Sequence, residues 1–209
     1  MTAVASITRA ARGPVGIDAS ERGAGARGGS EAGMEAGASA VGGTGLSTGY
    51  GAGHGVVIAR PARVADAGTI TRLVGVWSRQ GFTIQRRMSD VLSNLGDFAV
   101  STWGGERRVI ACGALETVSA TLGEIRSVAV EPGASGGGSG RAVVEHLVSE
   151  AEARGMNKVC LLTRVPAFFE RCGFRSVASA ELPVGFVGEH LSEQGRTHIG
   201  RTAMLRETG

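Results

Sequence analysis

The sequence predicts an α/β domain in which a mixed β-sheet carries helices on both faces. Three observations lead to this fold class. Short apolar runs bounded by glycine or proline alternate with segments whose apolar residues recur at helical spacing. The runs 98–102 and 109–115 flank a tight Gly104-Gly105 turn, which predicts an antiparallel hairpin. The run 158–163 is almost continuously apolar, as expected of a strand covered on both faces.

The expected elements before the hairpin are one strand and two helices. The strand lies at 56–60. A helix follows between Asp66, whose side chain is expected to cap its first turn, and Gly81. A second helical stretch, 88–95, ends at Gly96.

After the hairpin, strands and helices alternate. A strand at 125–130, bounded by Gly123 on its N-terminal side, leads through the glycine-rich loop 133–140 into an amphipathic helix that ends at Gly155. The apolar stripe of that helix consists of Val143, Val144, Leu147, Val148 and Ala151. The remaining expected elements are a strand at 158–163, a short helix at 166–172, and final strands at 174–178 and 202–205.

The first 54 residues differ in composition from the rest of the chain. Of the 35 glycines, 15 precede Val56, and this stretch has no apolar periodicity. We expect residues 1–54 to form a disordered Gly/Ala-rich tail and residues 55–209 to form the folded domain. The arginines of the tail also fit an organelle transit peptide, but its acidic residues favour the tail interpretation.

The overall composition indicates a cytoplasmic protein that binds small molecules. The formal net charge is only +3, and the basic residues are not clustered with aromatic ones, so neither nucleic acid nor membrane is an expected partner. No apolar run has the length of a membrane span. Cys112, Cys160 and Cys172 form no C-x-x-C pair and are expected to be buried thiols, and no metal site is expected. A homodimer is an open alternative.

The loop 133–140 has the properties of an anion site. Amides in the first turn of a helix lack intrahelical partners, and the helix dipole favours negative charge there. A Walker loop is excluded because Arg141-Ala142 follow Gly140, and a dinucleotide fingerprint counted from Gly136 would place its last glycine at Arg141. A flexible linker is the alternative, and the regular helix that follows favours the anion site.

This loop resembles the coenzyme A loop of the GNAT acetyltransferases, Arg/Gln-x-x-Gly-x-Gly/Ala. Ser135 stands where the family has Arg or Gln, so the resemblance implies weaker coenzyme binding through main-chain amides. It also implies a mostly antiparallel sheet in which a splayed parallel strand pair holds acetyl-CoA as co-substrate. The residues implied in coenzyme binding are Val128, Ala129, Val130, Ser135, Gly136, Gly137, Gly138, Ser139, Gly140 and Arg141.

Two longer segments are similar to bacterial amino-acid N-acetyltransferases that make N-acetylglutamate. They are GEIRSVAV at 123–130 and LLTRVPAFFERCGF at 161–174. The resemblance covers nearly all of 56–207, and it indicates the short, stand-alone form without an amino-acid kinase domain. It implies acetyl transfer to the α-amino group of L-glutamate, the first step of arginine biosynthesis. The alternative acceptors are another small amine and a protein N-terminus. The alternative to an enzyme is an acyl-CoA-binding regulator without turnover.

The resemblance also assigns residue roles. Glu124 is the candidate base, directly or through a water, and the alternative is a structural ion pair with Arg126 on the same strand face. A backbone N–H near Val128 is the candidate oxyanion donor. Arg86, Arg126, Arg201 and Thr163 are candidate acceptor-binding residues, although each arginine alone also fits a surface charge. The short helix offers no tyrosine or serine to protonate the thiolate, which leaves solvent as the proton source.

Overall fold

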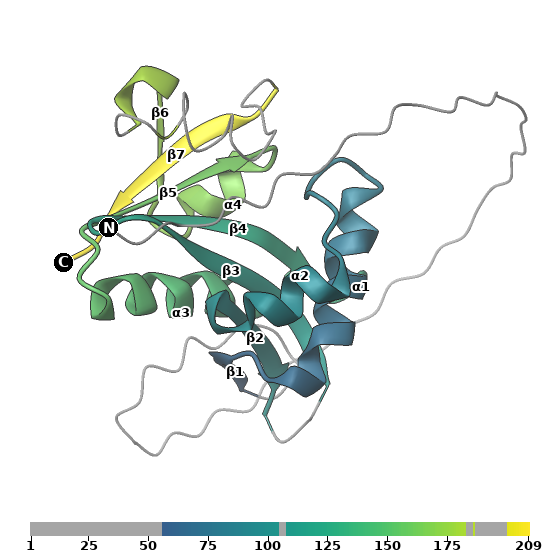
Figure 1. Cartoon of the computed structure of the whole chain (residues 1–209). Helices are drawn as coiled ribbons and strands as arrows, with labels where there is room; N and C mark the ends of the chain where they lie inside the picture. The colour runs from purple at the N-terminus through teal and green to yellow at the C-terminus, as the bar shows by residue number, and fades with distance from the viewer. Residues whose placement is uncertain (1–55, 105–107, 183–185, 187–199) are drawn as a thin grey trace, which may run out of the picture. The chain divides into compact units, whose positions relative to one another are not determined.

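A computed structural model describes residues 56–104, 108–182, 186 and 200–209 of the chain. Its strands form one seven-stranded sheet in the order β1-β2-β3-β4-β5-β7-β6 (Figure 1). All neighbouring described strands are antiparallel except β4 and β5, which confirms the expected mixed, mostly antiparallel sheet. The strands are β1 (Val57–Pro61), β2 (Phe98–Trp103), β3 (Val109–Ser119), β4 (Leu122–Val130), β5 (Lys158–Thr163), β6 (Arg175–Val177) and β7 (Thr202–Glu207).

Helices cover both faces of the sheet. The helices are α1 (Ala67–Ser78), α2 (Met88–Ser93), α3 (Ser139–Ala153) and α4 (Pro166–Glu170), with 3-10 turns η1 (Val64–Asp66), η2 (Leu95–Asp97) and η3 (Ser179–Glu181). One core cluster contains the apolar stripe of α3 and Phe169 of α4, and the other contains α1 residues and Val91 of α2. Successive β2 residues contribute to opposite clusters, Ala99 to the first and Val100 to the second, as strand alternation requires.

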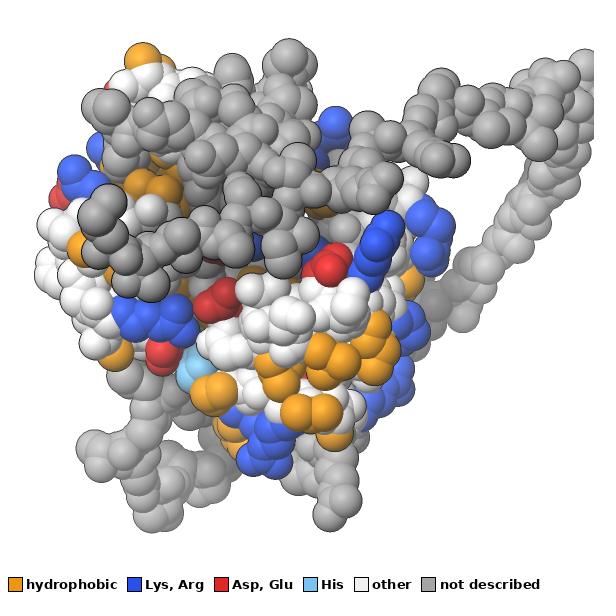
Figure 2. Space-filling view, viewed as in Figure 1, with side chains coloured by type: hydrophobic (Ala, Val, Ile, Leu, Met, Phe, Trp, Pro, Cys, Tyr) orange, Lys and Arg blue, Asp and Glu red, His pale blue; other side chains and the backbone are white. Residues whose placement is uncertain are grey.

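The amphipathic pattern of α3 predicts its burial correctly. Val143, Val144, Leu147, Val148 and Ala151 are all at most 2% exposed. By contrast, α2 buries only Val91, and its Met88 and Leu92 are 49% and 41% exposed. Figure 2 shows exposed hydrophobic side chains beside arginines on the face where α1 and α2 lie.

The expected boundary at Gly123 is wrong. Gly123 lies inside β4, which begins at Leu122 and pairs with β3 on both sides of a register irregularity between Thr117 and Ser119. A Cβ at Gly123 would lie 2.6 Å from Leu115 Cδ1 and 2.9 Å from Met156 Sδ. The glycine is therefore required by close packing within the sheet, and it is no strand end.

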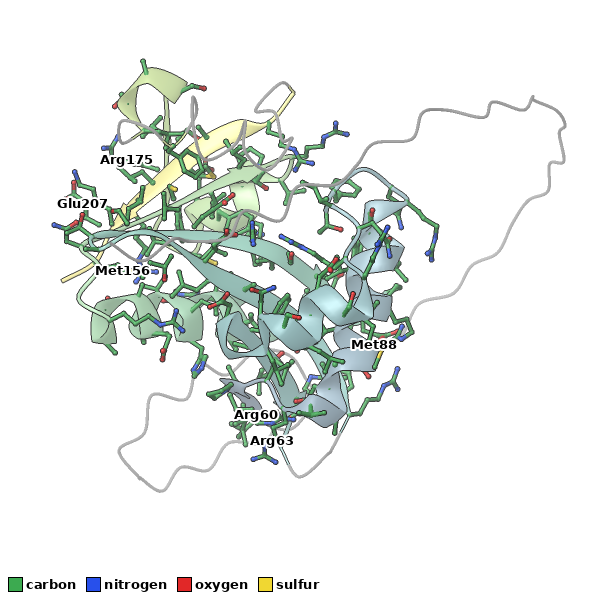
Figure 3. All side chains as sticks on the ribbon, viewed as in Figure 1. Arg60, Arg63, Met88, Met156, Arg175 and Glu207 are labelled. Atoms are coloured by element: carbon green, nitrogen blue, oxygen red, sulfur yellow. The ribbon has the colours of Figure 1, made fainter. Side chains whose placement is uncertain are left out.

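Asp66 is the N-cap residue of α1, as predicted, but its side chain does not cap the helix. Its carboxylate instead accepts hydrogen bonds from Arg60 Nη1 at 2.7 Å and from the Arg63 N–H at 2.8 Å (both arginines are labelled in Figure 3). Asp66 thus ties β1 to the turn that precedes α1.

The remaining predictions from the sequence concern the cysteines, the N-terminal segment and membrane spans. Cys112, Cys160 and Cys172 are buried free thiols, as expected. The proposed tail, 1–54, and Gly105 of the hairpin turn lie outside the described residues. None of the described helices combines the length and apolar character needed to cross a membrane.

Candidate active site

The parallel strands β4 and β5 separate after a short paired segment. Their register covers only Leu122 to Glu124 of β4 and Lys158 to Cys160 of β5, although both strands continue beyond it. The separation coincides with a bulge opposite β3, where Ser127 has a φ of 57°. Within the described residues, Ser127 is the single non-glycine residue with positive φ. The predicted splay is therefore present.

The bulge also changes which side chains face which layer. Ile125 packs in the α3 cluster, whereas Ala129 packs in the α1 cluster, although strict alternation would place both on one face. Val128 and Val130 consequently pack against the α3 cluster.

A cavity with a volume of about 300 Å³ opens where the two strands diverge. Its walls are mostly apolar. They come from the end of α1 and the segment after it, from β4 and the glycine loop, from β5 and α4, and from the residue before β7. The polar lining residues are Thr83, Arg86, Arg126, Ser127, Ser135, Thr163, Arg164 and Arg201.

Four arginines but no aspartate or glutamate occur among the described residues that line this cavity. Arg86 follows α1, Arg126 lies on β4, Arg164 follows β5, and Arg201 precedes β7. Arg201 Nη1 also donates to the Phe82 carbonyl at 3.3 Å, which links the β7 side of the cavity to the α1 side. A cavity with this charge favours anionic ligands.

The glycine loop brings the start of α3 to the end of β4. Gly136 and Gly138 have φ of 89° and 78°, a conformation that L side chains rarely adopt. The first intrahelical bond is donated by the Ala142 N–H to the Gly138 carbonyl, so the amides of 139–141 lie ahead of it. The Ser139 hydroxyl is buried and has no hydrogen-bond partner among the described residues. These groups are hydrogen-bond donors of the kind that an anion site needs, and anion binding at this loop stays a prediction.

Close packing fixes where this helix begins. A Cβ at Gly140 would lie 3.0 Å from Val130 Cγ2 and 3.3 Å from Phe168 Cζ, so α3 starts almost in contact with β4 and α4. The Ser139 carbonyl accepts a hydrogen bond from Ser101 Oγ at 3.1 Å, which holds the same turn to β2. These contacts therefore hold the start of α3 beside the end of β4.

Helix α1 is anchored to the opposite side of the β4 terminus. Trp77 Nε1 donates to the Val130 carbonyl at 2.7 Å, and Arg72 Nη1 donates to Glu131 Oε1 at 3.2 Å. The hydrogen bonds from Arg72 lower the pKa of Glu131 below its usual value. These contacts hold Trp77 in the cavity wall.

Residues 98–176 match the Acetyltransferase (GNAT) domain family. The chain is also 32% identical over 124 residues to an uncharacterized N-acetyltransferase of Chlorobaculum tepidum. That alignment covers 59% of this chain and 79% of the Chlorobaculum protein. This chain belongs to the GNAT acetyltransferases. It is accordingly an acyltransferase.

Two further proteins are similar to this GNAT chain. An amino-acid acetyltransferase of Mycobacterium tuberculosis is 31% identical over 125 residues, covering 57% of this chain and 69% of that one. The crystal structure of N-acetylglutamate synthase from Neisseria gonorrhoeae, complexed with coenzyme A and N-acetyl-glutamate, superposes with a TM-score of 0.64 at 25% identity. That superposition covers 75% of this chain and 36% of the Neisseria protein.

The GNAT cavity is lined by all four residues that are expected to bind the acceptor. Arg86, Arg126, Thr163 and Arg201 all line it. Among the expected coenzyme residues, Val128, Ala129, Val130 and Ser135 line it. Gly136 to Gly138 follow in the loop, and Ser139 to Arg141 form the first turn of α3. Arg141 lies 3.8 Å from Glu145 one turn along the helix.

Glu124 does not line the cavity. It is fully buried in the paired part of β4, opposite Glu116 of β3 and Cys160 of β5. Its neighbours Ile125 and Arg126 do line the cavity, so Glu124 lies next to it. Arg126 forms an ion pair with Glu116, a partner that the sequence did not indicate.

Sequence reasoning missed several residues of the cavity wall. Trp77 and Phe82, whose rings contact edge to face with centroids 5.7 Å apart, line the cavity, and no motif in the sequence assigns them to it. Arg164 was not singled out either, because nothing in the order of residues shows that the end of β5 faces the loop after α1. A Cβ at Gly81 would lie 3.0 Å from Arg164 Nη1.

Proposed function

We propose that this chain transfers the acetyl group of acetyl-CoA to the α-amino group of L-glutamate, the N-acetylglutamate synthase reaction that opens arginine biosynthesis. The observation that carries this proposal is the cavity at the splay of β4 and β5, with four arginines and no carboxylate among its described lining residues. The similar proteins from Mycobacterium and Neisseria, by their names, act on amino acids and glutamate, and this supports the choice of acceptor.

The glycine loop fits the diphosphate of coenzyme A. Amides at 139–141 and the buried Ser139 hydroxyl supply donors, and the α3 dipole adds positive potential. The departure at Ser135 removes one cationic or amide side chain but leaves these donors unchanged. Main-chain groups of Val128 to Val130, which have no β5 partner, would hydrogen-bond the amides of the pantetheine arm.

The acceptor would occupy the arginine-lined part of the cavity. Arg86, from the segment after α1, and Arg201, from the segment before β7, both line the cavity and would bind the two carboxylates of glutamate, together with Arg126 of β4. Thr163 is 5% exposed, and its Oγ1 accepts the Val165 N–H at 3.0 Å. Its own proton is therefore available for donation into the cavity.

Proton removal from the acceptor ammonium is assigned to Glu124. Because its side chain is buried behind the cavity wall, we assign the transfer to a path through an intervening water. A backbone N–H at the Ser127–Val128 bulge would stabilise the negative charge on the thioester oxygen as the amine attacks. The departing thiolate takes its proton from solvent. The nitrogen loses a second proton to solvent as the tetrahedral intermediate collapses to the neutral amide, and Glu124 passes the first proton on to solvent, so the reaction releases one proton overall.

Release of free thiol from acetyl-CoA tests the proposal. Purified chain is assayed with L-glutamate, L-glutamine, L-aspartate, glycine, a simple alkylamine and a peptide with a free N-terminus. We expect the highest kcat/KM with L-glutamate. Higher kcat/KM with an uncharged amine or a peptide would contradict glutamate as acceptor, and binding of coenzyme A without turnover of any amine would indicate a regulator.

A further inference from the structure

Arg86 and Arg126 each line two cavities. Besides the large one, they line a second cavity of about 10 Å³, roughly the space of one water molecule. The other residues of the small cavity are Asp90, Asn94, Asp97, Phe98, Ala114 and Glu116. Three of these are carboxylates, whereas the described residues of the large cavity include none. The two arginines therefore separate a cavity without acidic groups from an acidic one.

Glu116 holds Arg126 from the acidic side. Arg126 Nη2 forms an ion pair with Glu116 Oε2, and the two side chains are only 17% and 22% exposed. In the β3–β4 register, Glu116 lies opposite Glu124 and Ala114 lies opposite Arg126. Because strand side chains alternate, all three charged residues project from the sheet face that carries α1 and α2. Both members of the ion pair are therefore fixed on neighbouring strands and project from the same face of the sheet.

Such a pair restricts a guanidinium without using all its donors. Arginine has five N–H groups in a planar fork, so one carboxylate leaves donors for a second anion. A long side chain without such a contact samples several rotamers, and that freedom is lost when a ligand binds. An arginine that is already held binds a carboxylate with a smaller loss of entropy.

We propose that Glu116 is a positioning residue for the acceptor: it holds Arg126 in the cavity wall in the orientation that receives an acceptor carboxylate. This inference rests on the proposed function, because it requires an anionic acceptor in the large cavity. Glu116 acts through Arg126 and does not line the large cavity itself. A purely structural ion pair would support stability and leave acceptor binding unchanged.

Glu116→Gln in the full chain tests the inference, because it keeps the side-chain shape and removes the charge. We expect the KM for L-glutamate to rise about tenfold, the scale of one charge-assisted hydrogen bond. The KM for acetyl-CoA should stay within about twofold. The matched control is Glu150→Gln, which removes a carboxylate from the Arg154 ion pair on α3, and both KM values should then be unchanged.

Two further variants separate positioning from folding. Glu116→Asp keeps the charge on a shorter side chain and should keep more acceptor affinity than Glu116→Gln. Arg126→Gln combined with Glu116→Gln should have the acceptor KM of Arg126→Gln alone, because the effect of Glu116 passes through Arg126. Circular dichroism and Tm verify that each variant is folded.

The outcomes distinguish this inference from the proposed function. If the wild type acetylates L-glutamate but Glu116→Gln leaves the acceptor KM unchanged, the positioning role is wrong and the proposed function stands. The same holds if the effects of the two substitutions multiply independently, or if Glu116→Asp binds acceptor more weakly than Glu116→Gln. A wild type that acetylates no amino acid would overturn both.

Discussion

Gly123→Ala is expected to destabilise the domain, although it adds a single methyl group. The new Cβ would lie 2.6 Å from Leu115 Cδ1 and 2.9 Å from Met156 Sδ, where ordinary contacts between such atoms are about 3.5–4.0 Å. Leu115 is 0% exposed and Met156, which is labelled in Figure 3, is 4% exposed, so neither side chain can turn into solvent. The backbone is equally constrained, because Gly123 pairs with Thr117 of β3 and Val159 of β5.

The size of the effect follows from two opposing terms. Overpacking of a core typically costs about 1–3 kcal/mol. Alanine also restricts the unfolded chain, which returns about 0.4–1 kcal/mol because Gly123 has strand conformation that alanine can adopt. The expected net loss in the free energy of unfolding is about 1–2 kcal/mol.

Urea unfolding followed by circular dichroism measures this loss. The matched control is Gly68→Ala on α1, where no atom lies within 4 Å of the new Cβ, and this variant should gain about 0.5–1 kcal/mol. A Gly123→Ala variant as stable as the wild type would refute the argument that close packing explains this glycine.

Three further predictions concern the base, the pH dependence and the thiols. Glu124→Gln should lower kcat by about 10²–10⁴-fold with unchanged coenzyme affinity, and a kcat within about tenfold of wild type would exclude a base role. Burial opposes ionisation of Asp66, but hydrogen bonds from Arg60 and the Arg63 N–H outweigh it and lower the pKa of Asp66. Its contribution to stability is therefore present above about pH 4 and is lost as pH falls through the lowered pKa. In urea unfolding, the free energy of unfolding should fall more steeply with decreasing pH in the wild type than in Asp66→Asn. Parallel pH curves for the two proteins would contradict the pairing. Burial raises the pKa of Cys112 to about 12 and that of Cys172 to about 11. A thiol reagent at about pH 8 should therefore react slowly with the native protein and fast with the unfolded protein. Fast reaction of the native protein would contradict the burial.

Local patterns in the sequence were sufficient for much of the fold. The apolar stripe of α3 has helical spacing and is buried as predicted, because one long amphipathic helix on a sheet leaves few alternatives. The glycine loop before it is readable for a similar reason. Positive φ at Gly136 and Gly138 needs residues without a Cβ, and such clusters stand out in a sequence.

Features that depend on tertiary contacts were not readable. The bulge at Ser127 moves Ala129 to the opposite face from Ile125, although the local sequence shows no interruption of the strand. Gly123 looks like a strand boundary in the sequence, because the close packing of Leu115 and Met156 against it becomes visible only in the folded structure. The pairing of Glu116 with Arg126 likewise depends on the register of β3 and β4.

The candidate site also contains residues that the sequence predicted and residues that it did not. Arginines at three positions and Thr163 converge on one cavity as the family resemblance implied. The aromatic wall at Trp77 was missed, because its hydrogen bond to the Val130 carbonyl joins segments that are distant in the chain.

Calorimetric titration of coenzyme A into the full chain tests most directly whether the glycine loop and the start of α3 bind the diphosphate. We predict saturable binding that Gly138→Ala weakens about tenfold, because a side chain at φ 78° costs about 1–2 kcal/mol and would shift the loop. Gly155→Ala, at φ 77° near the far end of α3, is the matched control and should bind like wild type. No heat of binding with the wild type, or equal affinity of both variants, would contradict the account.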